Sequence, residues 1–179
     1  MIRGICIALL ALVMVSSGVS DSDGDDVQID EANTVAMIKA NYLFNFSKYS
    51  DWPDEYKSGK FSVGVYGDEK VYEELLDKYA TKSIGSQMLE VTKFENINEI
   101  KRPHVLFVSK EKREELSKVI KKLSKKSTMI ISDFSGALDE GVLINFVVKE
   151  GNIRFEINEK EADQREIILG DKIKNWAIK

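Results

Sequence analysis

The chain has 179 residues, of which 43% are hydrophobic and 31% charged, so it is the size of one globular domain with a sizeable core. It carries 26 basic and 30 acidic residues, and the net charge of −4 argues against nucleic acid as a partner. The single cysteine, Cys6, excludes a disulfide framework within the chain.

The N-terminal segment, residues 1–20, has the layout of a cleaved secretory signal peptide. Arg3 gives a short positive end, residues 4–15 are apolar, and residues 16–20 are small and weakly polar. The apolar run of 12 residues is shorter than the roughly 20 that span a bilayer. We therefore expect export to the periplasm with cleavage near Ser20, which leaves a mature protein without a thiol.

The acidic tract at residues 21–30 has little to bury and is predicted to be a solvated linker. A single domain is expected over residues 31–179. Its first helix should run from Glu31 to Tyr49, because apolar residues recur there at steps of three or four. The predicted buried stripe contains Val35, Ile38, Tyr42, Phe46 and Tyr49, widened by Leu43 and Phe44. The helix should end before Trp52-Pro53, since a residue that precedes proline avoids helical dihedral angles.

Strand and helix signals alternate through the rest of the chain. Strands are expected at 61–66, 88–94, 104–108 and 128–131, and helices at 68–79, 110–126 and 171–178, with Leu116, Val119, Ile120 and Leu123 as the inner stripe of the helix at 110–126. A hairpin follows the fourth strand. This order predicts an α/β fold with a layered, mainly parallel, Rossmann-like sheet flanked by helices and an antiparallel C-terminal hairpin.

The hairpin at 143–158 has two chemically different faces. A turn at Glu150-Gly151 would place Phe146 opposite Phe155 and Asn145 opposite Glu156. Alternation then gathers Ile144, Phe146, Val148, Ile153, Phe155 and Ile157 on one face, and Asn145, Arg154, Glu156 and Asn158 with Leu143 and Val147 on the other. The polar face is either a satisfied structural network or a place where a partner docks.

Two corners resemble binding sites only in part. The corner around Gly67 has too few glycines for a dinucleotide motif, and Asp68 fits better as the N-cap of the next helix. Asp133 lies between Ser132 and Ser135 after a predicted strand, but no glycine elbow frames either serine. We interpret both corners as capped turns.

No catalytic or metal-binding arrangement is evident. His104 is the only histidine, and at the start of a buried strand it is predicted to be a hydrogen-bonded structural residue. We expect no catalytic residue, no metal and no cofactor, although the sequence leaves a carboxylate pair open because it does not give their separation. The lysines at 118–126 form a basic run that fits a solvated helix face better than an anionic-surface contact.

Several blocks resemble the YfiR/HmsC-like family. The first is Lys39-Ala-Asn-Tyr-Leu-Phe-Asn-Phe-Ser-Lys-Tyr49, followed by Asp51-Trp52-Pro53. Later blocks in the same order are Phe61–Asp68, His104–Val108, Ile131-Ser132-Asp133 with Gly136, Ile144-Asn145-Phe146 and Ile153–Asn158. The resemblance extends from Lys39 to the C-terminus.

The resemblance implies a periplasmic regulator without catalytic activity. Members of this kind bind the periplasmic part of an inner-membrane diguanylate cyclase and hold it inactive, which lowers cyclic-di-GMP and biofilm formation, until an outer-membrane lipoprotein sequesters them. It also implies a homodimer. Pro103 stands where relatives commonly have a cysteine, so disulfide-linked redox control is not carried over.

Two functional hypotheses follow. In the first, the chain is a protein-binding regulator that contacts its membrane partner through Asn145, Phe146, Arg154 and Glu156. In the second, it is a small-molecule sensor working with a sensor histidine kinase, or an enzyme of unknown reaction. The second hypothesis places the site at the carboxyl edge of the sheet near Gly67 and Asp133, where a converging pocket would favour it.

Overall fold

The computed structural model describes residues 30–178. The expected signal peptide, residues 1–20, and the expected linker except for Asp30 lie outside the described residues. Asp30 is the N-cap of the first helix, and its side chain accepts a hydrogen bond from the Ala32 amide.

The core of the fold is a seven-stranded sheet with the order β3-β4-β2-β5-β6-β7-β8. Its strands are β2 (Phe61–Tyr66), β3 (Ser83–Ile84), β4 (Gln87–Phe94), β5 (Val105–Val108), β6 (Met129–Ser132), β7 (Ile144–Lys149) and β8 (Asn152–Ile157). The five inner strands are parallel, and β3 and β8 pair antiparallel at the two edges. The predicted α/β class, mainly parallel sheet and antiparallel hairpin are confirmed; the likeness to a Rossmann sheet stays a prediction.

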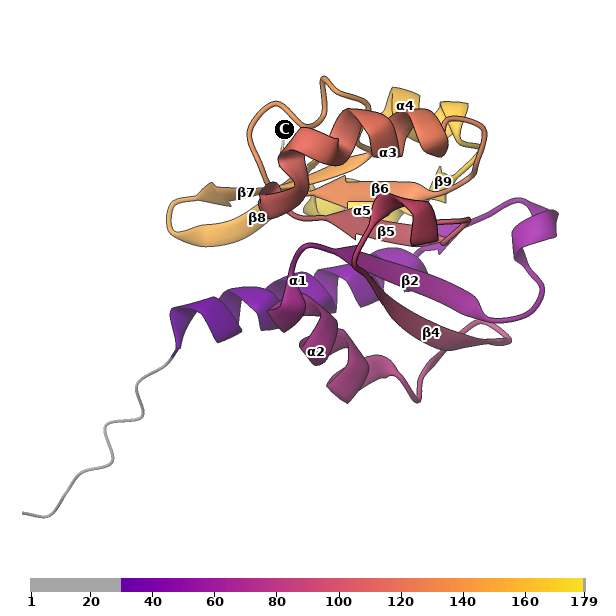
Figure 1. Cartoon of the computed structure of the whole chain (residues 1–179), viewed down its shortest axis with the longest axis horizontal. Helices are drawn as coiled ribbons and strands as arrows, with labels where there is room; N and C mark the ends of the chain where they lie inside the picture. The colour runs from indigo at the N-terminus through magenta and orange to yellow at the C-terminus, as the bar shows by residue number, and fades with distance from the viewer. Residues whose placement is uncertain (1–29, 179) are drawn as a thin grey trace, which may run out of the picture.

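Helices cover both faces of the sheet (Figure 1). The helices α1 (Glu31–Lys48) and α2 (Glu69–Tyr79) pack against each other on one face, and α3 (Leu116–Lys122) covers the other. Each face has its own apolar core; Phe46, Phe107 and Phe155 belong to the first, and Leu106, Leu116 and Ile130 to the second. The remaining helical segments are α4 (Glu159–Gln164), α5 (Asp171–Trp176) and the 3₁₀ turns Asp54–Tyr56, Ile97–Glu99 and Lys110–Glu115.

The buried stripe of α1 agrees with the prediction only in part, and Leu43, which was predicted to widen it, is fully buried. Of the five residues predicted as its stripe, only Phe46 is fully buried, and the buried residues are Ala36, Lys39, Ala40, Leu43, Phe46 and Ser47. The small alanine side chains allow the helix to lie close to the sheet, and the larger residues beside them are left half-buried. This rotation turns a lysine, Lys39, toward the sheet.

The prediction of a single helix at 110–126 is also wrong in part. The chain first forms the 3₁₀ segment Lys110–Glu115, which is kinked at Lys112 with φ −108° and ψ 17°, and α3 follows from Leu116 to Lys122. The Ser109 hydroxyl accepts a hydrogen bond from the amide of Glu111 and so starts the segment as a tight turn. The predicted inner stripe holds in α3, where Leu116, Val119 and Leu123 are buried and Ile120 is half-buried.

The hairpin has the predicted register, with Asn145 opposite Glu156 and Phe146 opposite Phe155. Both turn residues have positive φ, 52° at Glu150 and 73° at Gly151, as a two-residue hairpin turn of this twist requires. In Figure 1 the hairpin projects beyond the neighbouring strands at the carboxyl edge of the sheet.

The C-terminal part closes the structure with short contacts that periodicity does not reveal. The strands β1 (Ser50–Asp51) and β9 (Ile168–Leu169) form a separate two-stranded sheet. The predicted C-terminal helix ends at Trp176, two residues early, and the Ile178 amide instead donates to the Phe155 carbonyl at the outer edge of β8. The tail therefore protects part of an edge strand.

Candidate binding site at the carboxyl edge of the sheet

The strand order reverses between β2 and β5. From β2 the chain crosses through α2 to β4 on one side, whereas from β5 it crosses through α3 to β6 on the other. In open α/β sheets, ligands bind in the crevice beyond the carboxyl ends of the strands at such a point. The chain here supplies Gly67-Asp68 after β2, Ser109-Lys110 after β5 and Asp133 after β6.

A close approach of two side chains to the Gly67 backbone shapes this crevice. Gly67 has φ 96°, and a Cβ at this position would lie 2.5 Å from Lys112 Cγ and 2.7 Å from Ser109 Oγ. The Ser109 hydroxyl donates to the Gly67 carbonyl at 2.8 Å. Glycine is therefore needed here for both dihedral angle and space, which is the tight-turn role predicted for the corner.

A buried ion pair crosses the crevice. The ammonium group of Lys39 lies 2.6 Å from Asp133 Oδ2 and 3.6 Å from Asp68 Oδ2. Lys39 is only 7% exposed, and the other carboxylate oxygen of Asp133 accepts from the Lys110 amide at 2.6 Å. Asp68 is the N-cap of α2, as predicted, and accepts from the Val71 amide at 3.1 Å. The cluster joins α1, α2 and the ends of two strands.

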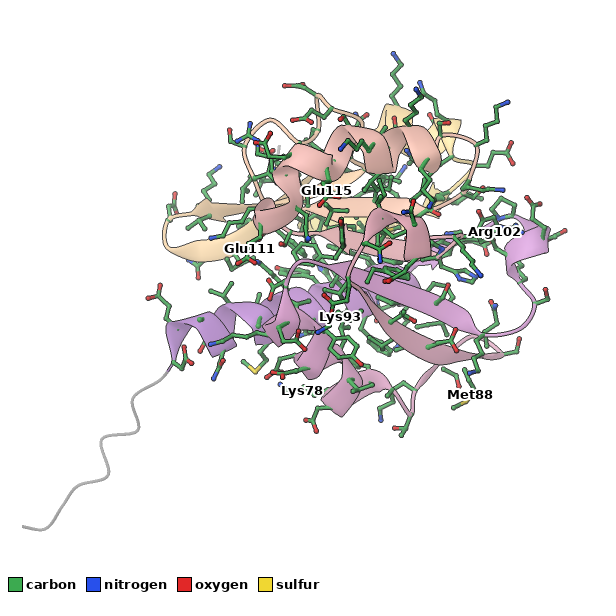
Figure 2. The ribbon with its side chains drawn as sticks, in the orientation of Figure 1. Lys78, Met88, Lys93, Arg102, Glu111 and Glu115 are labelled. Atoms are coloured by element: carbon green, nitrogen blue, oxygen red, sulfur yellow. The ribbon has the colours of Figure 1, made fainter. Side chains whose placement is uncertain are left out.

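Two clefts open on either side of this cluster, and both are lined by Val35, Lys39 and Lys110. The first, of about 770 Å³, extends between the start of α1 and the start of α2 and includes Glu111, which Figure 2 labels. The second, of about 570 Å³, extends between the loop after β6 and the hairpin. Both volumes are in the range of small-molecule sites, roughly 300–1,000 Å³.

The structure brings two of the four predicted partner-binding residues into the second cleft from the polar face of the hairpin. Asn145 is 2% exposed, and its Oδ1 has no hydrogen-bond partner among the described residues. Glu156, its neighbour across the hairpin, is half-buried and lines the same cleft. The Glu156 carboxylate makes no ion pair within residues 30–178.

The other two predicted residues lie apart. Phe146 also borders the second cleft, but it is only 3% exposed. Its ring centroid lies 6.0 Å from that of Phe46 and 6.1 Å from that of Phe107 in the core. Arg154 is exposed and lines a separate hollow with Asn41 and Trp176. The predicted set is therefore split between a core aromatic, a cleft and an outer surface.

His104 lies at the opposite, amino edge of the sheet. Its Nδ1 accepts from the Ser62 amide at 3.0 Å, so Nε2 carries the hydrogen and donates to the Tyr56 carbonyl at 2.8 Å. The Phe61 ring stacks on the imidazole at 4.2 Å. Burial lowers the pKa of His104, which makes it a neutral, hydrogen-bonded structural residue, as the sequence predicted.

Tyr66, at the end of β2, is a second titratable group near the crevice. Burial, assisted by the Glu115 carboxylate that Figure 2 labels, raises the pKa of Tyr66 to about 12. The Lys112 ammonium lies 4.7 Å above its ring. The phenol therefore stays neutral at pH 7 and serves as packing for the corner.

Lys39 was not singled out by sequence reasoning. A lysine in an amphipathic helix is ordinarily exposed, and its partner Asp133 lies 94 residues away. The available signal was its spacing, since Ala36, Lys39 and Leu43 recur at steps of three and four along one face. Among residues 30–178, no cluster of potential metal ligands occurs, and no helix has the length and apolarity to cross a bilayer.

The chain matches a known protein family. A family model described as YfiR/HmsC-like matches residues 36–175, more than three quarters of the 179-residue chain. No curated protein matches the sequence. The matched range includes the whole seven-stranded sheet, the Lys39 cluster and the hairpin.

Proposed function

The chain belongs to the YfiR/HmsC-like family, which is known for periplasmic regulators, and we propose that it is a non-catalytic periplasmic protein that represses an inner-membrane signalling enzyme. The proposed target is the periplasmic part of a diguanylate cyclase. Capture of this part would hold the enzyme inactive and lower cyclic-di-GMP and biofilm formation. We also propose that an outer-membrane lipoprotein sequesters this protein and so releases the cyclase, and that the protein acts as a homodimer.

The observation that carries this proposal is the hairpin. It projects from the sheet (Figure 1), and its polar face carries the Arg154 guanidinium exposed to solvent. Within residues 30–178, Arg154 makes no ion pair, whereas the buried Arg165 is paired with Glu161 at 2.7 Å. A planar guanidinium left free on a projecting strand is well suited to a bidentate contact with a partner carboxylate.

Arg154→Leu tests this contact. We expect binding to purified periplasmic domains of the diguanylate cyclases of the source bacterium to weaken at least about tenfold, since a lost charge-assisted contact is worth roughly 1.5–3 kcal/mol. The melting temperature should not change, because the side chain is exposed. Lys149→Leu, an exposed cation on the same hairpin, is the matched control and should bind like wild type. Unchanged binding of Arg154→Leu would contradict the assignment.

A second candidate function is a small-molecule sensor that works with a sensor histidine kinase. The clefts at the strand-order reversal favour it, because this is where the fold class places ligands. A thermal-shift screen tests it, since a ligand of the native state raises the melting temperature by mass action. Ligand binding and partner capture can coexist, because a ligand of one state can tune affinity for a protein partner.

A further inference from the structure

The cleft between the hairpin and the loop after β6 contains polar groups that the fold does not use. Its wall includes Lys110, Asn145 and Glu156, with Phe134 and Val147 as apolar neighbours. At about 570 Å³ it is large enough for a small organic molecule.

The Asn145 amide is the most informative of these groups. Asn145 is 2% exposed, and within residues 30–178 its Oδ1 has no hydrogen-bond partner and its side-chain nitrogen makes no hydrogen bond. Ser132, its in-register neighbour on β6, also has a buried hydroxyl without a partner among the described residues. Buried polar groups are ordinarily hydrogen-bonded, because an unpaired one loses its contacts with water. Asn145 therefore has hydrogen-bonding capacity to offer a ligand.

The charged groups in the cleft are also unmatched. Neither the Lys110 ammonium nor the Glu156 carboxylate forms an ion pair or a side-chain hydrogen bond among the described residues. Lys39 and Asp133, which line the same cleft, are paired with each other at 2.6 Å and are already satisfied. Within the part of the chain that the structure describes, the cleft thus presents one unpaired cation and one unpaired carboxylate, with a buried amide on its wall.

We propose that this cleft binds a small zwitterion that carries one ammonium and one carboxylate group. The ligand ammonium pairs with Glu156, the ligand carboxylate pairs with Lys110 and accepts from the Asn145 amide, and a short apolar body packs against Phe134 and Val147. Both charged ends are then matched within one cleft. The inference rests on the second candidate function, the small-molecule sensor, and is independent of partner capture by Arg154.

Asn145→Leu separates a binding role from a structural one. Leucine has a similar volume and no polar atoms, so replacing an amide without partners should leave the melting temperature of the protein alone unchanged or raise it. A structural role, such as a water bridge between Asn145 and Ser132, would instead make the same substitution lower it.

The experiment is a thermal-shift titration of the mature protein with L-valine and 4-aminobutyrate. At about five times the dissociation constant, we expect a rise of roughly 2–4 °C in the melting temperature. Butyrate and n-butylamine, each with one of the two charges, are the ligand controls and should give less than half of this rise. Lys110→Gln, Glu156→Gln and Asn145→Leu should each abolish it, whereas Lys149→Gln, outside the cleft, should keep it.

Each outcome bears on the proposal. A zwitterion-dependent rise that disappears in the three cleft variants supports it. No rise with either zwitterion, an equal rise with the single-charge analogues, or a rise that survives all three variants overturns it. Binding of the cyclase domain by wild type and its loss in Arg154→Leu, measured in parallel, shows whether the primary proposed function stands when the zwitterion site fails.

Discussion

The two halves of the carboxyl edge contain similar groups in opposite states. On the α1 side, Lys39 and Asp133 are buried together and each charge has a partner. On the hairpin side, Lys110 and Glu156 line one cleft and make no ion pair within residues 30–178, and the Oδ1 of the neighbouring Asn145 has no partner there. The buried, matched charges join elements of the fold, whereas the exposed Lys110 and the half-buried Glu156 are available for binding. Charged groups at this edge therefore have two separate roles, one in holding the fold together and one in binding.

Among the substitutions considered, Lys39→Met is expected to have the largest effect on stability. The substitution leaves the Asp133 carboxylate buried without its cation, and we expect the free energy of unfolding to fall by about 3–5 kcal/mol. Chemical denaturation at pH 7 measures it. Lys70→Met, which removes an exposed lysine paired with Asp30 at 3.1 Å, is the control and should cost at most about 1 kcal/mol. Equal losses in the two variants would show that Lys39 does not hold the edge together.

Phe146→Leu is expected to have an intermediate effect. Because Phe146 packs among core aromatics, loss of its ring should destabilise the protein by about 1–3 kcal/mol and leave partner binding of the folded protein unchanged. Denaturation and binding are measured on the same preparation. Val148→Ala, 72% exposed at the hairpin, should change stability by less than about 0.5 kcal/mol. Weakened partner binding at unchanged stability would instead show that Phe146 contacts the partner.

His104→Gln should change how the stability of the protein depends on pH. Burial lowers the pKa of His104 below its ordinary value of 6.5 in the folded state, so the unfolded state binds the proton first as the pH falls. The contribution of the neutral imidazole is present above pH 6.5 and is lost as the pH falls below that value toward the folded-state pKa. Melting temperatures from pH 7.5 to 5 should therefore fall more steeply for wild type than for the variant. Parallel curves would contradict the assignment.

The hairpin shows how much sequence can predict. Its register, turn and two faces follow from alternation and one glycine, and the structure has all three. Alternation does not tell which face is covered, however, and α1 packs on the Phe146 ring, whose contact with a partner stays a prediction. Burial depends on how elements far apart in the chain pack, and a strand pattern carries no information on that.

The Lys39 cluster could not be predicted for a related reason. Its members come from α1, the start of α2 and the end of β6, and only the crossover topology brings them together. The location could be anticipated, because parallel strands bring their carboxyl ends to one edge, and Gly67 and Asp133 were placed there from the sequence. The pairing of the charges could not be anticipated, because it depends on the rotation of α1 that its alanines allow.

We propose that this domain represses a diguanylate cyclase through its surface and makes or breaks no bond. The most direct measurement is cyclic-di-GMP in the source bacterium after deletion of the gene, with complementation by wild type and by Arg154→Leu. We predict that cyclic-di-GMP rises on deletion, returns to its original level with wild type, and stays high with Arg154→Leu at equal protein abundance. Cyclic-di-GMP that does not change on deletion, or that both versions restore equally, would contradict the account.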